Sequence, residues 1–453
     1  MTVIKKLNFF KETSIAPLVI FRIIFGAMML LGTLRFLAKG WVNDLYIQPQ
    51  TYFGYLGFEW VKPLTGTWMY LPFILVIISS LGVILGYLYK YSAPLLFLSF
   101  SYIELLDKSN YLNHYYFLSL ITFLLIFVPA NRSFSLDILF KRNTEQKTVP
   151  IWTIGIFKFQ LAIVYIFAGI AKLETDWLFN AQPLKIWLQA HREMPVFGTL
   201  LKEEWVAYLF SWFGCIYDLF IVFFLLSKKT RSIAYLFVVV FHFVTWFLLP
   251  IGIFPWVMIV STLIFFSPEF HENLLKKFKW KKSADKTIEI NNTKSKVVQV
   301  LIATYILFQL FIPFRYVLYP GNLFWNEEGF RFSWRVMLMH KEGTATFYVR
   351  DSATKREIQV RNNEFLSKTQ EDQMSTQPDM ILQYAQFLKE KFSDSTFIIN
   401  NQTYKIQNPT IHATIYVSIN GRISQLFIDK KHDLSKIPYN LAHRNWIEPF
   451  DSK

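Results

Sequence analysis

The segment AGIAKLETDW, from Ala168 to Trp177, places a lysine at the point where an apolar run ends. Lys172 closes the run, and Glu174 and Asp176 follow it closely. An interfacial lysine that pairs with a nearby carboxylate beside a belt tryptophan would give the same pattern. The alternative is an amine at the mouth of an apolar pocket, where the loss of water favours its neutral, basic form. Lys172 is therefore a candidate base that deprotonates a substrate.

A second polar segment separates two apolar runs. It is LLDKSNYLNHYYF, from Leu105 to Phe117, and its Asn113 and His114 lie next to the start of the second run. A carboxamide and an imidazole can orient and polarise a bound oxygen or hydroxyl. A histidine in a short loop can equally be a solvated or belt residue, so both interpretations remain open for His114.

Two titratable side chains lie inside apolar runs, His242 in VVFHFVTWF and Arg22 in VIFRIIFG. Such groups are costly at membrane depth, so each is either a functional residue or a buried structural partner. His242 can link helices through a hydrogen bond, or it can line the same cavity as Lys172. For Arg22 we expect a structural pair.

Several other kinds of site have no support in the sequence. The motifs G-x-x-x-x-G-K-[ST], G-x-G-x-x-G, G-x-S-x-G and H-E-x-x-H do not occur. The single cysteine, Cys215, excludes an intramolecular disulfide and a C-x-x-C site. Because the eight histidines are scattered along the chain, we expect no metal.

The composition indicates the class of protein in which these residues lie. Of the 453 residues, 53% are hydrophobic, 19% are aromatic and 17% are charged, whereas average globular chains carry about 25% charged residues. These values indicate a polytopic membrane protein. The net charge of +15 could indicate nucleic-acid binding, but the basic residues alternate with long apolar stretches and fit the positive-inside rule better. No nucleic acid is expected.

Apolar runs of about 20 residues, enough to cross roughly 30 Å of hydrocarbon, predict the membrane spans. They lie near residues 15–36, 69–89, 115–129, 151–171, 206–227, 232–249, 253–267 and 297–317. A shorter run at 92–106 would make a ninth span. The most basic loops then share one side, which is predicted to be cytoplasmic. Lys172, His114 and the C-terminus fall on the exoplasmic side.

From about Leu318 the composition is that of a water-soluble domain. The sequence thus predicts a mostly α membrane protein of about eight to nine spans, residues 1–317, followed by an exoplasmic α+β domain, residues 318–453. Asn420-Gly421, between two alternating runs, predicts a β-hairpin. A second hairpin is expected around Asp351-Ser352, and helical spacing is found from Met380 to Phe392.

Taken together, these segments resemble the vitamin K-dependent gamma-carboxylase family, whose bacterial relatives share its horizontally transferred transmembrane domain. The resemblance covers nearly the whole chain, in order and spacing as well as in residues. Besides the two segments quoted first, it rests on FHF at His242, IGIF, FSPE, EGFRFSWRVMLMH, IYVSINGRISQLFID and HRNWIEPF.

The resemblance implies an enzyme that couples two reactions. A reduced naphthoquinone, vitamin K as menaquinol or phylloquinol, is oxidised by O₂ to its epoxide, and CO₂ is added to the γ-carbon of glutamate in a peptide. The enzyme would be a peptidyl-glutamate 4-carboxylase-like lyase of a bacterial inner membrane that acts on an exported peptide or protein. The pocket must also shield the strong base from water.

The resemblance also assigns residues. Lys172 matches the base that deprotonates the hydroquinone, and Asn113 and His114 match the pair around the quinone oxygens. The other matches are substrate-binding residues. They are Trp334, Met337 and His340, in the segment that resembles the glutamate-binding part of the family, and the helix histidine His242.

The chain departs from the animal enzymes in three respects. One more residue separates Trp334 from His340, the chain is shorter, and with Cys215 alone it cannot form their disulfide. No segment is assigned to binding a propeptide. Three alternatives therefore remain: a quinol epoxidase without carboxylase activity, a membrane lipid-binding or transport protein, and a purely structural membrane protein.

Overall fold

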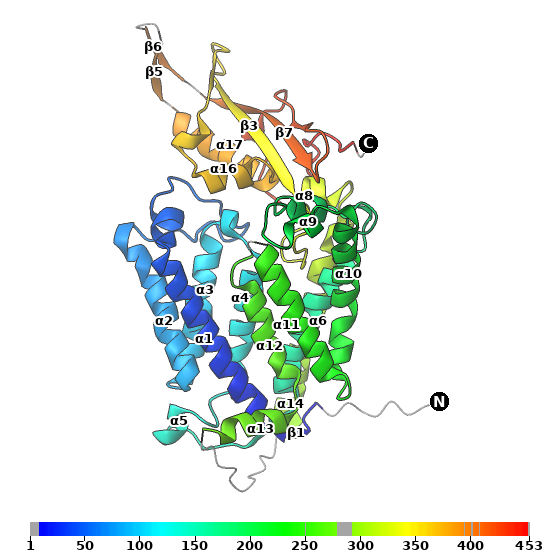
Figure 1. The fold of residues 1–453 in the computed structure, drawn as a ribbon. Coiled ribbons are helices and arrows are strands. Elements are labelled where there is room, and N and C mark those ends of the chain that lie inside the picture. The colour runs from blue at the N-terminus through cyan, green and yellow to red at the C-terminus, as the bar shows by residue number, and fades with distance from the viewer. Residues whose placement is uncertain are drawn as a thin grey trace.

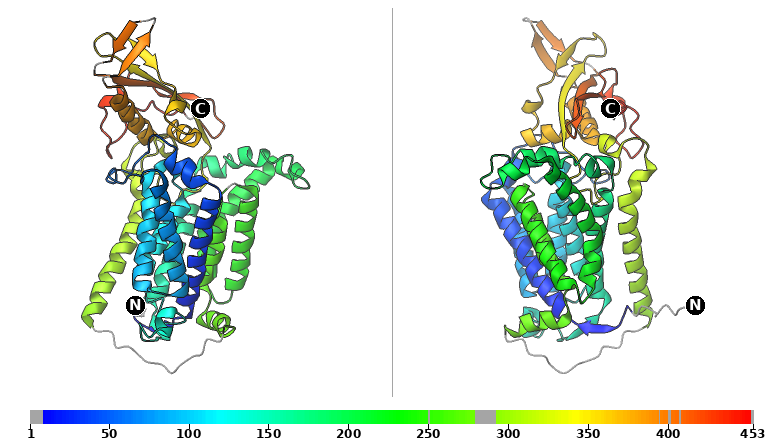
Figure 2. Two further views of the ribbon diagram at one scale, coloured as in Figure 1. Left: turned by 90° about the vertical axis from the view of Figure 1, so that its left-hand side faces the viewer. Right: turned by 45° about the vertical axis from the view of Figure 1, so that its right-hand side comes forward.

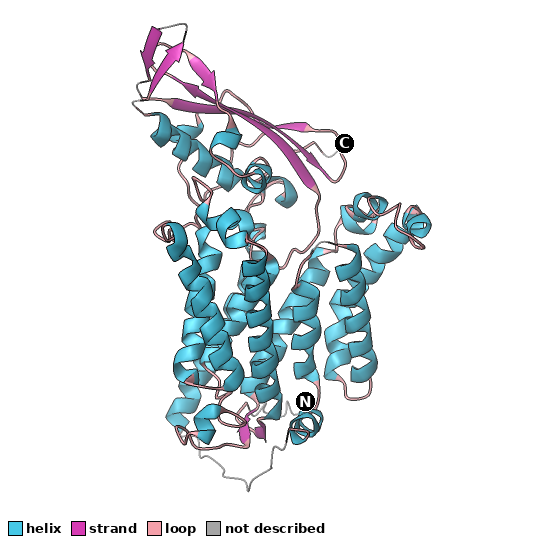
Figure 3. Cartoon of the chain, turned by 60° about the vertical axis from the view of Figure 1, so that its left-hand side comes forward, coloured by secondary structure: helices cyan, strands magenta, loops and turns pink. Residues whose placement is uncertain are grey.

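The computed structural model describes residues 9–249, 251–278, 292–393, 395–399, 402–406 and 408–451. Long helices stand side by side in a bundle, and a sheet with its own helices lies at one end of that bundle (Figure 1). Apart from one short strand pair at the opposite end, the strands belong to this C-terminal region (Figure 3). The predicted fold class, a polytopic helical membrane protein with a C-terminal α+β domain, is confirmed.

Six helices among the described residues are long and apolar enough to cross a membrane. They are α1 (Ala16–Ala38), α2 (Tyr70–Leu85, extended by η2 at Gly66–Met69), α6 (Trp152–Ala171), α10 (Glu204–Leu226), α11 (Arg231–Leu248) and α14 (Asn292–Phe314). Two shorter apolar helices, α4 (Asn113–Ile126) and α12 (Phe254–Thr262, followed by η4 at Leu263–Phe265), stand among them. The borderline run at 92–106 is helical as well, within α3 (Tyr89–Leu106).

A buried arginine fixes the turn between α2 and α3. Gly86 ends α2 with a φ of +59°, and a Cβ there would lie 1.8 Å from the guanidinium of Arg22. Arg22 is fully buried, and its NH2 group donates a hydrogen bond of 2.7 Å to the backbone carbonyl of Phe134. Arg22 thus joins α1 to the connections at the end of the bundle away from the C-terminal domain.

That end also carries short elements (Figure 1). They are the antiparallel pair β1 (Glu12–Ser14) and β2 (Thr148–Pro150), α5 (Leu136–Leu139) and α13 (Pro268–Lys276). Most of the expected lysine-rich loop, residues 279–291, lies outside the described residues.

The last long helix, α14, stands at the side of the bundle (Figure 2). Only 11% of its most apolar window is buried. Polar side chains join it to α6: the Tyr305 hydroxyl donates to Gln160 at 2.6 Å, and the Gln160 amide reaches Gln309 at 3.5 Å. Between lipid-facing helices, such hydrogen bonds supply the specificity that apolar contact lacks.

The end of the bundle nearest the C-terminal domain is built from short helices. They are η1 (Asn43–Ile47), η3 (Lys108–Asn110), α7 (Thr175–Leu178), α8 (Leu184–Gln189) and α9 (Gly198–Leu201). After α14, the chain continues through η5 (Arg315–Leu318) and α15 (Leu323–Asn326). We propose that the C-terminal domain starts at residue 318, where η5 ends.

The C-terminal domain is a four-stranded antiparallel sheet of order β4-β3-β7-β8. Its strands are β3 (Lys341–Arg350), β4 (Glu357–Gln359), β7 (Thr410–Ile419) and β8 (Gln425–Ile428). Helices α16 (Lys368–Met374) and α17 (Pro378–Phe392) lie between the sheet and the bundle (Figure 1). The remaining elements are η6 (Asn362–Glu364), the hairpin β5 (Thr396–Ile399) and β6 (Gln402–Lys405), and η7 (Leu434–Lys436).

The local predictions for this domain are confirmed. Strands β7 and β8 form the hairpin, and Asn420 and Gly421 have φ angles of +52° and +77°, the sign that a type I′ turn requires. The second hairpin pairs β3 with β4, and α17 covers the helical pattern. Apolar side chains of β3, β7 and α17 share one core, in which Phe347 meets Tyr384 edge-on.

Buried charges join the two parts of the molecule. The Asp379 carboxylate on α17 accepts from Lys108 of η3 at 2.8 Å and from Arg331 at 2.6 Å. Burial acts to raise the pKa of Asp379, but these two cations outweigh it and hold the pKa well below its ordinary value. Asp107 accepts a hydrogen bond of 2.8 Å from Gln370 beside them. The domain is therefore anchored to the loop that precedes α4.

Replacing Asp379 by asparagine leaves Lys108 and Arg331 buried without their counter-charge. Breaking a buried ion pair in this way costs about 3–5 kcal/mol, so we expect a clear fall in the melting temperature of the purified protein. The control is Asp372→Asn, which removes a surface pair with Lys368 and should cost at most about 1 kcal/mol. Equal effects of the two substitutions would contradict the role of Asp379 as the buried counter-charge of these two cations.

The predicted topology can be tested with single thiols, because Cys215 is buried and is the sole cysteine. Lys355→Cys places an exposed thiol on the C-terminal domain, and Lys141→Cys places one at the opposite end of the bundle. In intact cells, a membrane-impermeant thiol reagent should label the first variant and not the second. Labelling of Lys141→Cys alone would show that the chain has the opposite orientation in the membrane.

Candidate active site

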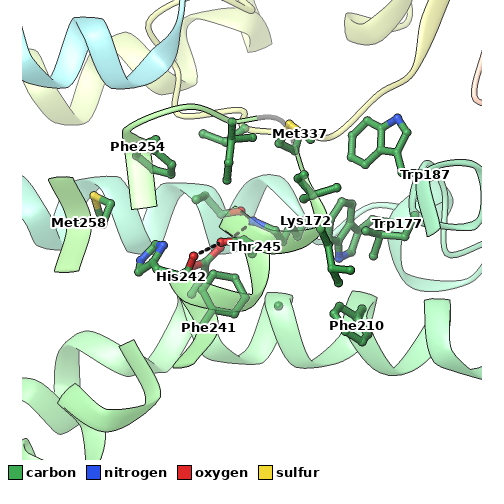
Figure 4. Close-up of a pocket in the computed structure, with 18 of the residues that line it drawn as sticks. Lys172, Trp177, Trp187, Phe210, Phe241, His242, Thr245, Phe254, Met258 and Met337 are labelled. Atoms are coloured by element: carbon green, nitrogen blue, oxygen red, sulfur yellow. Dashed lines mark hydrogen bonds and ion pairs between the residues drawn. The ribbon is translucent and has the colours of Figure 1, made fainter. Parts of the chain in front are cut away.

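An apolar pocket lies inside the bundle, close to the C-terminal domain (Figure 4). Helices α6, α8, α10, α11 and α12 supply its walls, and the space between the side chains amounts to about 900 Å³, including the part open to the surroundings. Its aromatic and thioether lining includes Trp177, Trp187, Phe210, Phe241, Phe254, Met258 and Met337. A pocket with this apolar, aromatic lining suits a flat, apolar small molecule.

Lys172 forms the main polar feature of this wall. It caps the C-terminal end of α6, and its Nζ lies 2.6 Å from Oδ2 of Asp218 on α10 and 3.3 Å from the carbonyl of Ala168. Both charged side chains are buried, and the ring of Trp177 lies 5.3 Å from Nζ. An amine and a carboxylate held together in an apolar wall can pass one proton between them.

Sequence reasoning missed Asp218. The signal was present, because Asp218 stands in the middle of the apolar run WFGCIYDLF, where a carboxylate is costly without a partner. What the sequence could not show is that α10 packs along α6 in the register that brings Asp218 to Lys172, 46 residues earlier.

His242 lies on α11 in the same pocket wall as Lys172. Its Nε2 is 3.2 Å from the hydroxyl of Tyr165, which also lies 3.3 Å from the hydroxyl of Thr262. The side chain of Thr245 donates to the His242 carbonyl at 3.0 Å, as Figure 4 shows. The histidine therefore both links helices and lines the pocket, so the two interpretations left open by the sequence are compatible.

The segment between α15 and β3 reaches the pocket with Met337, which lies above Lys172 in Figure 4. Trp334 and Met337 have φ angles of +60° and +56°, the left-handed region that such residues rarely adopt. Trp334 is 1% exposed and stacks on Tyr116 of α4, at 5.0 Å between ring centroids. Trp334 thus packs beside the pocket and fixes the segment, while Met337 contributes to the lining.

His340 lies outside the lining but contacts it. Its Nδ1 accepts a hydrogen bond of 3.4 Å from the indole of Trp187, and its Nε2 lies 3.0 Å from Glu342. The backbone N–H of His340 donates to the side chain of Asn420 at the β7 turn. This histidine connects the pocket wall to the sheet.

Asn113 and His114 are placed beside the pocket, not in its lining. The Asn113 amide donates to the backbone carbonyl of Arg335 at 3.0 Å, so it holds the segment that carries Met337. His114 is buried, and its ring centroid lies 5.5 Å from that of Phe254, a pocket residue. The structure therefore brings Lys172, His242 and Met337 into one lining and sets the other sequence-predicted residues around it.

The C-terminal domain also binds the loop that follows Lys172 through hydrogen bonds. Asp176 accepts two hydrogen bonds of 2.7 Å from Arg422 and one of 2.8 Å from Asn420. Burial acts to raise the pKa of Asp176, but these hydrogen bonds outweigh it and lower the pKa to about 2. Asp176 therefore stays charged at neutral pH and holds the β7–β8 turn. It lies only four residues after Lys172 in the chain.

Glu174 lies in the same loop and behaves differently. Its side chain caps α7 by accepting from the backbone N–H of Trp177 at 3.2 Å. Burial, with a further contribution from the charge of Asp176, raises the pKa of Glu174 to about 7. The carboxyl group therefore exchanges its proton near neutral pH, two residues from Lys172.

No group of three or more His, Cys, Asp or Glu side chains able to hold a metal ion occurs within the described part of the chain.

The fold and the pocket define a polytopic membrane protein with an apolar pocket close to its C-terminal domain. Two family comparisons agree. The HTTM domain family matches residues 10–270, and the family described as vitamin K-dependent gamma-carboxylase, lumenal domain, matches residues 294–453. The chain belongs to the vitamin K-dependent gamma-carboxylase family, which supports a carboxylase-like activity. No solved structure matches the chain.

The pKa of Glu174 predicts a pH dependence of stability. Because the folded state raises this pKa from 4.5 to about 7, it binds more protons than the unfolded state in this window, and stability falls as the pH rises from about 4.5 to 7. Glu174→Gln keeps the capping oxygen but cannot titrate, so its melting temperature should fall less across this range. The control is Glu193→Gln, an exposed residue whose replacement should leave the pH dependence of the melting temperature unchanged. An unchanged pH dependence in Glu174→Gln would refute the prediction.

Proposed function

We propose that the protein oxidises a reduced naphthoquinone, menaquinol or phylloquinol, with O₂ to the epoxide and uses the reaction to carboxylate glutamate in an exported peptide with CO₂. The observation that carries the proposal is the buried Lys172–Asp218 pair in an apolar pocket that the C-terminal segment closes with Met337. The site would face the exoplasmic side, in a bacterial inner membrane.

The pocket residues fit a reduced naphthoquinone. Aromatic rings of Trp177, Phe241 and Phe254 line it and suit a flat bicyclic ring. Lys172 and the His242–Tyr165 pair supply polar atoms for ring oxygens. When bound, the reduced quinone supplies the reaction with O₂ that generates a base stronger than any side chain.

Lys172 would start the chemistry. Its Nζ must be neutral to accept a proton from a bound hydroxyl, and Asp218 at 2.6 Å can take the proton that Nζ releases. Trp177 and the α6 carbonyl of Ala168 keep the amine in place. Lys172 and Asp218 would therefore act as one unit that receives the proton of the bound hydroxyl.

The surrounding residues would position the two substrates. Asn113 holds the backbone of Arg335 and thereby Met337 over the pocket, which excludes water from the strongly basic centre. Trp334, His340 and Met337 would present the glutamate side chain, and His114 would orient the ring oxygens after movement of Phe254, the ring against which it packs. These assignments follow from the family resemblance.

Lys172→Ala should lose epoxide formation and CO₂ uptake together, by at least about 100-fold, because the first proton transfer no longer has its base. The assay follows epoxide from a reduced naphthoquinone and labelled CO₂ in a glutamate peptide, with protein purified in lipid. The control is Lys185→Ala, which removes a lysine of α8 paired with Glu204 near the same end of the bundle.

Each outcome of this assay decides between functions. Both products from the unmutated protein support the coupled enzyme, and epoxide without CO₂ uptake assigns a quinol epoxidase. No epoxide from the unmutated protein, with intact folding, would leave the transport and structural alternatives. Full activity of Lys172→Ala would remove Lys172 from the mechanism.

A further inference from the structure

A second cavity lies in the bundle, on a different face of α12 from the pocket of Lys172. Phe254 and Met258 of α12 line the first pocket, whereas Ile253 and Val257 line the second. The second cavity encloses about 640 Å³, including its open part, and α1, α2, α3 and α4 supply most of its wall. Because α12 separates them, the two cavities are distinct sites.

The cavity wall carries two opposite charges that do not meet. Arg35, in the last turn of α1, and Glu104, in the last turn of α3, both line it, and no ion pair joins them. Across the described residues, Glu104 has neither a hydrogen bond nor an ion pair. A carboxylate in this setting is costly without a partner. The geometry therefore points to a ligand that bridges the two side chains.

Aromatic rings make up most of the remaining wall near the charges. Four of these rings, from α1, the connection after it, η1 and α2, form a contact network with centroid distances between 5.2 and 6.2 Å. They are Phe36, Trp41, Tyr46 and Phe73, and Phe100 with Tyr115 forms a second pair at 6.2 Å. Aromatic faces beside a carboxylate form the surroundings that bind an ammonium group, through cation–π attraction as well as charge.

The surface of α1 beside the cavity is apolar. Leu31 and Leu34, on α1 next to Arg35, are 61% and 44% exposed. All the charged and aromatic lining lies at the end of the bundle nearest the C-terminal domain, where α1 ends and α4 begins. This is the depth of phospholipid headgroups, so the ligand can enter sideways with its acyl chains along α1.

We propose that this cavity binds the headgroup of phosphatidylethanolamine, with its ammonium group at Glu104 among the aromatic rings and its phosphate at Arg35. Arg35 and Glu104 together carry no net charge, which matches a zwitterion. The ethanolamine N–H groups supply the donors that the Glu104 carboxylate lacks. The guanidinium of Arg35, 4.9 Å above the ring of Trp41, is held at the rim to receive the phosphate.

The test is lipid binding by the purified full chain in detergent, measured by native mass spectrometry with dioleoyl phosphatidylethanolamine and dioleoyl phosphatidylglycerol in competition. The unmutated protein should bind the ethanolamine lipid about 10-fold more tightly. Glu104→Gln, which keeps the shape of the side chain, should reduce this preference to near one. Arg35→Gln should weaken the binding of both lipids.

Matched controls lie nearby on the exposed surface. Lys39→Gln and Glu59→Gln make the same changes of charge outside the cavity and should retain the preference. Equal binding of the two lipids by the unmutated protein, or an unchanged preference in Glu104→Gln, would overturn the proposal. Displacement of the lipid by a naphthoquinol, dependent on Glu104, would also overturn it.

Discussion

The contact between Lys172 and Asp218 constrains the structure most strongly. Each of these groups would be costly alone in an apolar wall, and together they fix the register of α6 against α10. This register leaves the pocket as a space between α6, α10 and α11. The segment that carries Met337 covers it. This ion pair in the wall of an apolar cavity is the feature on which the proposed function rests.

The C-terminal domain completes this site. Asp379 anchors it to the loop before α4, and Asp176 anchors its β7–β8 turn to the loop after Lys172. These two anchors hold the intervening segment, with Trp334 and Met337 in strained backbone conformations, over the pocket. In the proposed function, a peptide bound by the C-terminal domain would reach the pocket through this one segment.

The two cavities lie on different faces of α12 and differ in the arrangement of their charges. The pocket of Lys172 pairs its charges within the wall, so its remaining lining is free to receive an apolar ring. In the second cavity, Arg35 and Glu104 stay apart and need a bridging group. A short helix such as α12 can serve both, because Phe254 and Met258 share one face of the helix while Ile253 and Val257 share another, rotated by about 100°.

The sequence by itself determined the apolar helices, the C-terminal hairpins and the candidate lysine, although six helices, not eight or nine, are long and apolar enough to span a membrane among the described residues. Hydrophobic length, turn residues and the cost of charge at membrane depth are local properties, so they can be read residue by residue. Only the tertiary structure decided that Asp218 is the partner of Lys172, that Asn113 holds a backbone carbonyl, and that His114 lies behind Phe254. Those contacts depend on helix packing between distant segments, because register and rotation between helices are set by side-chain fit that no single segment encodes.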